Sequence, residues 1–192
     1  MKEQDYVDRL TAISNNLVKR MLQPVNPYKF NIKKLAHGRT LEIGCGIGRN
    51  LGYLDKPFNV GIDVNESAIN HVTSLGHTAF SVKDFDAFTN YDSSFDHLLF
   101  SHVLEHMTID ESSTLVQKYL KYVKPGGTVI VICPQMRGYL SDPTHVEFMN
   151  PFKLRKLLEV CQLKILSSKS FPLPKWFGRL FIYNEYIVVA EK

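Results

Sequence analysis

Three glycines at alternate positions constrain the fold of this chain more than any other feature. Gly44, Gly46 and Gly48 follow a short apolar run and precede a helical pattern. A strand that ends in glycines lets its backbone approach a ligand closely, because no Cβ stands in the way. A dinucleotide phosphate loop would need G-x-G-x-x-G. Counted from Gly44 the third glycine is replaced by Arg49, and counted from Gly46 it is replaced by Leu51. The run therefore predicts a ligand site that is not a dinucleotide phosphate loop.

The composition is that of an ordinary soluble globular protein. Of the 192 residues, 44% are hydrophobic and 22% are charged, and the net charge of +4 does not by itself indicate nucleic acid. We expect one domain over residues 1–192, with a helical cover at 1–38 and a core at 39–192. No apolar run could span a membrane and no signal peptide is recognisable, so we expect a cytoplasmic protein. Three widely spaced cysteines indicate neither a disulfide framework nor a zinc ribbon.

Helical and strand patterns alternate along most of the chain. Apolar spacing predicts helices over residues 5–22 and 26–38. Thr108 and Glu111 have the spacing of a capping box, and Asn150 precedes a proline that can open another helix. Predicted strands cover residues 40–43, 59–63, 78–82, 95–101, 128–133, 163–169 and 182–190. This alternation predicts an α/β fold with a mostly parallel sheet and helices on both faces.

Glu42 and the three glycines after it resemble motif I of the class I methyltransferases, which use S-adenosyl-L-methionine. That ligand has no phosphate and carries a sulfonium cation, which an acidic strand residue suits. The resemblance covers residues 39–192. It implies a Rossmann-like sheet of seven strands with an antiparallel final pair, and an enzyme that transfers a methyl group from S-adenosyl-L-methionine.

The resemblance also implies positions for the cofactor. Asp63 follows Gly44 by nineteen residues, where the family places an acidic residue on the ribose hydroxyls. Val64 would flank the adenine, Asp84 would meet the adenine amino group and Phe85 would lie under the ring. The backbone after the fourth strand would follow the methionine end. The predicted cofactor-binding residues are Glu42, Gly44, Cys45, Gly46, Gly48, Asp63, Val64, Asp84, Phe85 and Ser101.

Three histidines are candidates for a catalytic base. The sulfonium is already an activated methyl donor, so a base is needed only where the acceptor must lose a proton. His102 and His106 follow the fourth strand, and His145 follows the fifth. A histidine is the natural base near neutral pH. The same histidines are equally compatible with a structural role, since the local sequence is common in family members of differing mechanism.

A metal site is an alternative for the same residues. His102, Glu105 and His106 form H-x-x-E-H, a spacing that binds zinc on helices elsewhere, and His145 could add a fourth ligand. Some methyltransferases of small RNA ends and of quinone precursors hold a divalent metal in a comparable cluster. This chain has His102 where those enzymes carry a glutamate, so we predict no bound metal and keep a metal-dependent O-methyltransferase as the alternative.

Motifs that the sequence lacks reduce the classes of methyl acceptor that we expect. The Asn/Asp-Pro-Pro-aromatic motif of DNA amino-methyltransferases is missing after the fourth strand, and Cys133-Pro134 reverses the Pro-Cys order of cytosine-C5 enzymes. We therefore expect no DNA substrate, but a small-molecule, glycan or lipid-linked acceptor. Residues 171–181 are apolar, aromatic and basic, a composition that could wall an acceptor pocket or rest against a lipid surface. We nevertheless expect a packed loop that joins the last two strands. The missing third glycine also argues against the class of nicotinamide dehydrogenases. A protein that binds the cofactor without catalysis remains the alternative function. The oligomeric state and the pathway are not predicted.

Overall fold

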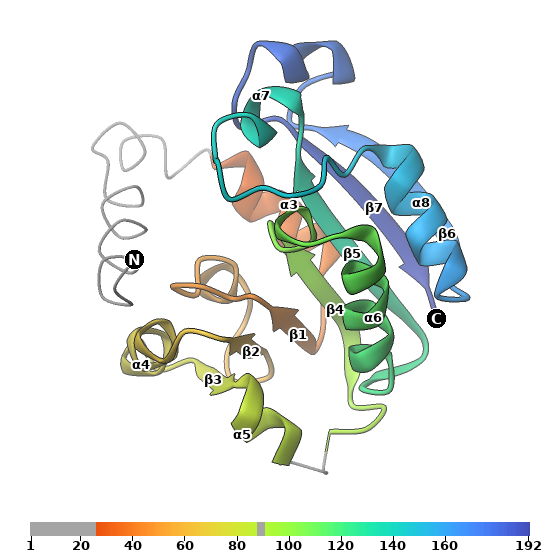
Figure 1. Ribbon diagram of the computed structural model, residues 1–192. Coiled ribbons are helices and arrows are strands. Elements are labelled where there is room, and N and C mark those ends of the chain that lie inside the picture. Colours follow the sequence, from red (N-terminus) through yellow and green to blue (C-terminus); the bar gives the residue numbers. More distant parts are fainter. Residues whose placement is uncertain (1–25, 88–90) are drawn as a thin grey trace.

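The computed structural model describes residues 26–87 and 91–192. The strands are β1 (Thr40–Ile43), β2 (Val60–Asp63), β3 (Thr78–Ser81), β4 (Phe95–Ser101), β5 (Val123–Pro134), β6 (Lys164–Phe171) and β7 (Glu185–Glu191). They form one seven-stranded sheet in the order β3-β2-β1-β4-β5-β7-β6 (Figure 1). β1 to β5 pair in parallel, whereas β7 is antiparallel to both β5 and β6. The predicted α/β fold with a mostly parallel sheet and an antiparallel final pair is confirmed.

Helices lie on both faces of this sheet. The α-helices are α3 (Pro27–Leu35), α4 (Glu66–Ser74), α5 (Val82–Ala87), α6 (Ile109–Leu120), α7 (Met136–Tyr139) and α8 (Pro151–Val160), and the 3₁₀ turns are η2 (Leu51–Tyr53), η3 (Leu104–His106) and η4 (Lys175–Arg179). Strand side chains alternate between two cores: Leu98 and Phe100 pack in the core that α5, α6 and α8 cover, and Leu99 packs with Ile32 of α3. Among the described residues, no helix is both long and apolar enough to span a membrane.

The helix starts follow local side-chain chemistry. The Asn26 side chain caps α3, and Asn150 caps α8 ahead of a proline in the first turn. Thr108 and Glu111 form both hydrogen bonds of a capping box at the start of α6. These three predicted starts are confirmed. The predicted helix over residues 5–22 lies outside the described part of the chain.

Predicted strand bounds agree with the structure to within three residues, except at β5. Phe95 pairs with Val123, whereas His97 pairs with Thr128, so residues 124–127 bulge out of the ladder between the two pairs. We predicted this strand to begin only at residue 128. The structure instead starts β5 ahead of the bulge, because Val123 already aligns with β4.

The sheet order positions the site. Between β1 and β4 the chain order of the strands reverses, and open α/β sheets bind ligands outside the carboxyl ends of their strands at such a switch point. The glycine run leaves the carboxyl end of β1 at this place, and Ser101 ends β4 beside it. The antiparallel β7 begins at the same edge, because Glu185 pairs with Pro134 at the end of β5.

Candidate functional site

The glycine loop after β1 has a backbone that requires glycine. Gly44, Gly46 and Gly48 have φ angles of +71°, +51° and +75°, in the left-handed region. A Cβ on Gly44 would lie 2.5 Å from Cγ2 of Val103, and one on Gly48 would lie 3.0 Å from Cγ2 of Val72. The loop is thus both conformationally unusual and closely packed, so that its amide groups are fixed in place.

Asp63 holds this loop against the end of β2. Its Oδ2 accepts a hydrogen bond from the amide of Gly46 at 2.8 Å, and its Oδ1 accepts one from the amide of Asn65 at 2.9 Å. A carboxylate has about four acceptor positions, so each oxygen keeps capacity for a further donor. The side chain predicted to meet ribose hydroxyls therefore also fixes the glycine loop.

Glu42 is a buried carboxyl group on β1, two residues before the glycine loop begins. Its Oε1 accepts a hydrogen bond from Nδ2 of Asn50 at 2.7 Å, and its Oε2 has no partner among the described residues. Burial raises the pKa of Glu42 to about 7, although the bond from Asn50 opposes the shift. A buried oxygen without a partner is costly, and a bound ligand at the switch point could satisfy it.

The other predicted cofactor residues differ in what they offer. Val64 is 83% exposed beyond the end of β2, and Asp84 is exposed and accepts a hydrogen bond from the Ser81 hydroxyl. Cys45 lies within the glycine loop but buries its thiol in the core, so it offers only backbone groups to a ligand. Phe85, which we predicted to lie under an adenine ring, is fully buried among core aromatics with its ring stacked on that of Tyr91.

A shallow, solvent-open cleft with about 250 Å³ of empty space lies between α3 and the carboxyl edge of the sheet. It is lined by Tyr28, Asn31, Ile32, Arg49, Asn50, Ser101, Ile132 and Glu185. Of these, only Ser101 was predicted as a site residue. The sequence carried no signal for Asn50, whose contact with Glu42 appears only in the folded structure. Tyr28 and Glu185 come from elements whose position depends on the tertiary fold.

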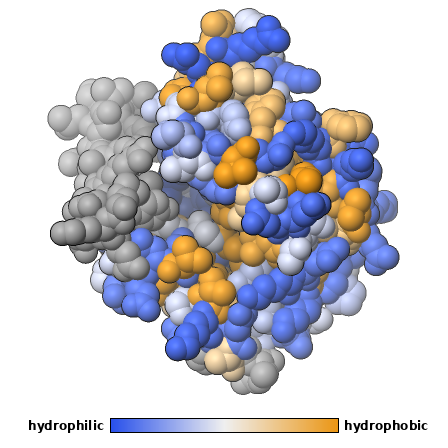
Figure 2. Space-filling model, viewed as in Figure 1, coloured by the Kyte–Doolittle hydropathy of each residue, from blue (hydrophilic) through white to orange (hydrophobic). Residues whose placement is uncertain are grey.

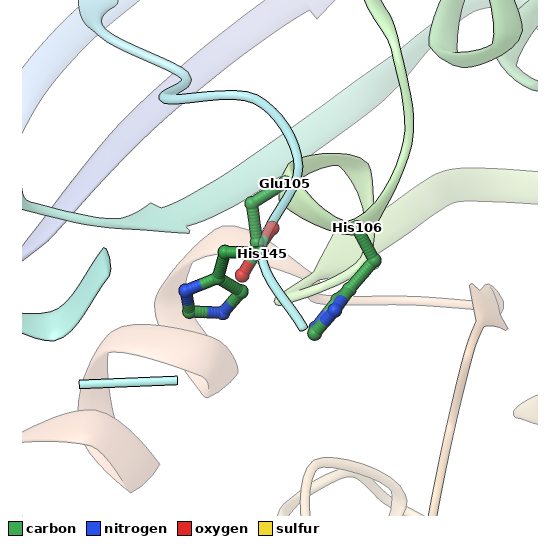
Figure 3. A group of neighbouring side chains, drawn as sticks. All are labelled: Glu105, His106 and His145. Carbon is green, nitrogen blue, oxygen red and sulfur yellow. The ribbon is translucent and has the colours of Figure 1, made fainter. Parts of the chain in front are cut away.

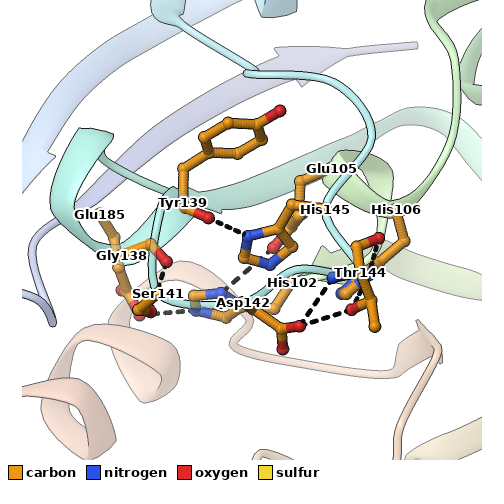
Figure 4. Close-up of polar contacts among 10 residues, drawn as sticks. All are labelled: His102, Glu105, His106, Gly138, Tyr139, Ser141, Asp142, Thr144, His145 and Glu185. Carbon is orange, nitrogen blue, oxygen red and sulfur yellow. Dashed lines mark hydrogen bonds and ion pairs between the residues drawn. The ribbon is translucent and has the colours of Figure 1, made fainter.

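His102 is held between two carboxylates. It has a φ angle of +58°, its Nε2 lies 2.8 Å from Oε1 of Glu185, and its Nδ1 lies 3.3 Å from Oε1 of Glu105 (Figure 4). Burial opposes the charged ring, but the two carboxylates outweigh it and raise the pKa of His102 to about 9. His102 is therefore a cation near neutral pH, with both ring nitrogens protonated.

His106 and His145 form a second group with Glu105. One ligand atom from each of the three side chains lies within 4.8 Å of the others, and the two imidazole centroids are 4.7 Å apart (Figure 3). Glu105 and His106 belong to η3, whereas His145 comes from the loop after α7. The Glu105 carbonyl accepts hydrogen bonds from the amides of Val146 and Glu147, at 2.8 and 3.1 Å, which fixes that loop beside η3.

The segment after β6 is only partly packed. Gly178 of η4 is buried against Gln135, but Trp176 and Leu180 are 66% and 74% exposed. Leu140, which follows α7, is 68% exposed. Figure 2 shows apolar side chains among hydrophilic ones on this upper part of the molecule. The predicted packed loop therefore describes Gly178 but not the exposed side chains beside it.

Comparison with known proteins finds a family match for part of the chain. Residues 40–127 match the family described as a methyltransferase domain. The phosphoethanolamine N-methyltransferase of Plasmodium falciparum is 24% identical over 171 residues, which are 79% of this chain and 62% of that protein. The chain thus spans about three fifths of the length of this relative.

Solved structures share the fold over most of the chain. A SAM-dependent methyltransferase from Archaeoglobus fulgidus has a TM-score of 0.66 at 20% identity, with 92% of this chain and 93% of that chain covered. The [4+2]-cyclase SpnF also has a TM-score of 0.66, at 16% identity, with 86% and 80% covered. One fold therefore includes both a methyltransferase and a cyclase, so chemistry has to be argued from the site.

Proposed function

We propose that this chain, which carries a class I methyltransferase domain, transfers a methyl group from S-adenosyl-L-methionine to a small-molecule or glycan-type acceptor. The observation that carries the proposal is the glycine loop at the switch point between β1 and β4, with Asp63 bonded to the amide of Gly46. The run lacks the third glycine of a dinucleotide phosphate loop. This combination suits a nucleoside ligand without a phosphate.

The residues around the switch point fit that cofactor. Asp63 retains acceptor capacity for the ribose hydroxyls, and exposed Val64 offers an apolar surface beside it for the base. The unpartnered Oε2 of Glu42 provides negative potential near the loop when the carboxyl group is ionised. Asp84 stays a proposed partner of the adenine amino group, whereas the buried Phe85 leaves the proposed site.

The bound cofactor supplies a methyl group on a sulfonium centre, which is already activated for transfer. The chain would then act mainly by holding the acceptor in line and by accepting a proton where the acceptor has one to lose. His102 carries no free lone pair in its protonated state, so it is poorly suited as the base. Of the three candidates we propose His106 and His145, and we assign His102 a positioning role toward Glu105 and Glu185.

The exposed surface beside α7 and η4 favours an acceptor with an apolar portion. Trp176 and Leu180 are exposed next to the cations Lys175 and Arg179. Basic and aromatic side chains together favour a lipid–water interface, so a lipid-linked acceptor is the second candidate. Flotation with anionic liposomes tests it: association of the wild-type chain that Trp176→Ala weakens supports this acceptor, and no association of the wild-type chain overturns it.

Turnover separates the proposal from cofactor binding without catalysis. The assay follows transfer from methyl-labelled S-adenosyl-L-methionine to a panel of hydroxyl, amine and phosphate-bearing acceptors, with phosphoethanolamine included because a relative acts on it. Labelled product above a boiled-enzyme control supports an enzyme. Cofactor binding without product for every acceptor favours a binding protein, and no cofactor binding overturns the proposal.

A further inference from the structure

The group formed by Glu105, His106 and His145 has the composition of a metal site. Two imidazoles and one carboxylate recur as ligands of Zn²⁺ and of other first-row transition ions. The three side chains point toward one another across the gap between η3 and the loop after α7 (Figure 3). Ligand atoms on one zinc ion lie about 3 to 4 Å apart, so atoms within 4.8 Å need only small side-chain rotations.

The hydrogen bonds of the two histidines leave a ring nitrogen for an ion. Nδ1 of His145 lies 2.7 Å from the carbonyl oxygen of Tyr139, which requires a proton on Nδ1 and leaves the lone pair on Nε2 (Figure 4). Nδ1 of His106 lies 3.3 Å from the carbonyl oxygen and 3.2 Å from the hydroxyl of Thr144. Backbone carbonyls are the usual outer partners of metal-bound histidines, because they fix the tautomer and the ring orientation.

Glu105 supplies an independent observation that points to a ligand. Its side chain is fully buried, yet neither carboxylate oxygen accepts a well-aligned hydrogen bond from a described residue. The His102 ring faces Oε1 at 3.3 Å, and the buried Cys133 thiol, a weak donor, also lies against the carboxylate. A buried carboxylate with an oxygen left unsatisfied is costly unless a cation or a donor completes it.

We propose that Glu105, His106 and His145 bind a divalent first-row transition ion such as Zn²⁺. His102 lies outside this set, since Glu185 and Glu105 hold it by its two ring nitrogens. The sequence argued against a metal because His102 stands where a glutamate ligand is expected. This argument does not apply to a site made of Glu105, His106 and His145 alone. His102 acts as an outer partner that orients the Glu105 carboxylate, in the way that ligating carboxylates are commonly supported.

Three protein ligands leave coordination positions open on such an ion. Because His106 is exposed and His145 is half-buried, the site faces solvent beyond the ends of β4 and β5. An oxygen or nitrogen atom of a methyl acceptor could occupy an open position. This consequence rests on the proposed function, whereas metal binding itself does not. With the ion bound, His106 and His145 act as ligands and not as the base, and the ion would favour loss of the acceptor's proton by lowering the pKa of the acceptor.

Titration of the metal alone tests the proposal. Full-length protein is treated with a chelator and dialysed, and ZnCl₂ is added in a calorimeter without S-adenosyl-L-methionine. We expect one equivalent to bind, and we expect His106→Ala and His145→Ala each to weaken binding by at least about tenfold. His71→Ala is the matched control, because His71 lies on α4, which packs beside β2 and β3 on another part of the sheet.

A second ion and a folding check keep the outcome decisive. Co²⁺ should give visible absorption bands in the wild-type chain and in His71→Ala, and the bands should weaken in both ligand variants. Circular dichroism identifies a variant that has lost its fold. Because His106 is exposed, we expect His106→Ala to remain folded. No stoichiometric binding, or binding that both folded ligand variants retain within threefold, overturns the site. Cofactor binding is measured separately, so failure of the metal site leaves the proposed function standing.

Discussion

Asp63 combines two roles in one side chain. It holds the amide of Gly46 through Oδ2 while lying where the cofactor ribose is expected. We predict that Asp63→Ala weakens binding of S-adenosyl-L-methionine by at least about tenfold and lowers the free energy of unfolding by about 1–3 kcal/mol, since a buried amide loses its partner. Calorimetry and urea denaturation measure the two effects. His145→Ala is the control, and a larger loss of cofactor affinity in that variant would contradict the assignment.

Glu42 gives a prediction about pH. Burial raises its pKa in the folded chain from about 4.5 to about 7. Between these values the folded state retains a proton that the unfolded state has lost, so this group's contribution to stability falls as pH rises through the window. Glutamine does not titrate. The melting temperature of Glu42→Gln minus that of the wild-type chain should therefore increase as the pH is raised from about 5 to about 8. A difference that stays constant with pH would contradict the raised pKa.

At the scale of elements, the turn after β1 depends on glycine for two reasons, a positive φ angle and the contact with Val103. Gly44→Ala should lower the free energy of unfolding by about 1–3 kcal/mol. Gly52 of η2 is the matched control, because its φ angle is not positive and a Cβ there would meet nothing within 4 Å. Gly52→Ala should be neutral or slightly stabilising. Equal losses in the two variants by urea denaturation would refute this explanation.

Helix starts that depend on residues close in the chain could be predicted from the sequence. The caps at Asn26, Thr108 and Asn150 depend on residues at most three positions away, so pattern alone located them. The pair of His102 with Glu185 could not be found in this way, because 83 positions separate the two residues and only the antiparallel β7 brings them together. The burial of Phe85 could not be predicted from its local sequence, because it depends on core packing against Tyr91.

At the scale of the whole molecule, the sheet order explains why one short run was so informative. A reversal of chain order between β1 and β4 makes the end of β1 the natural ligand site, and the glycines occupy it. Residues 40–127 match the methyltransferase domain family, and the predicted Rossmann-like fold is shared with a solved SAM-dependent methyltransferase. The sequence analysis already grouped Glu105, His106 and His145 with His102 as an alternative metal site, but the distances among them depend on how η3 packs against the loop after α7.

The central claim is that the glycine loop binds a nucleoside cofactor without a phosphate. Calorimetric titration of the full-length chain with S-adenosyl-L-methionine and, in parallel, with NAD⁺ tests it most directly. We predict one equivalent of S-adenosyl-L-methionine bound with a dissociation constant in the micromolar range, about −8 kcal/mol in binding free energy, and no measurable binding of NAD⁺. Binding of NAD⁺ at comparable affinity, or no binding of S-adenosyl-L-methionine, would contradict the account.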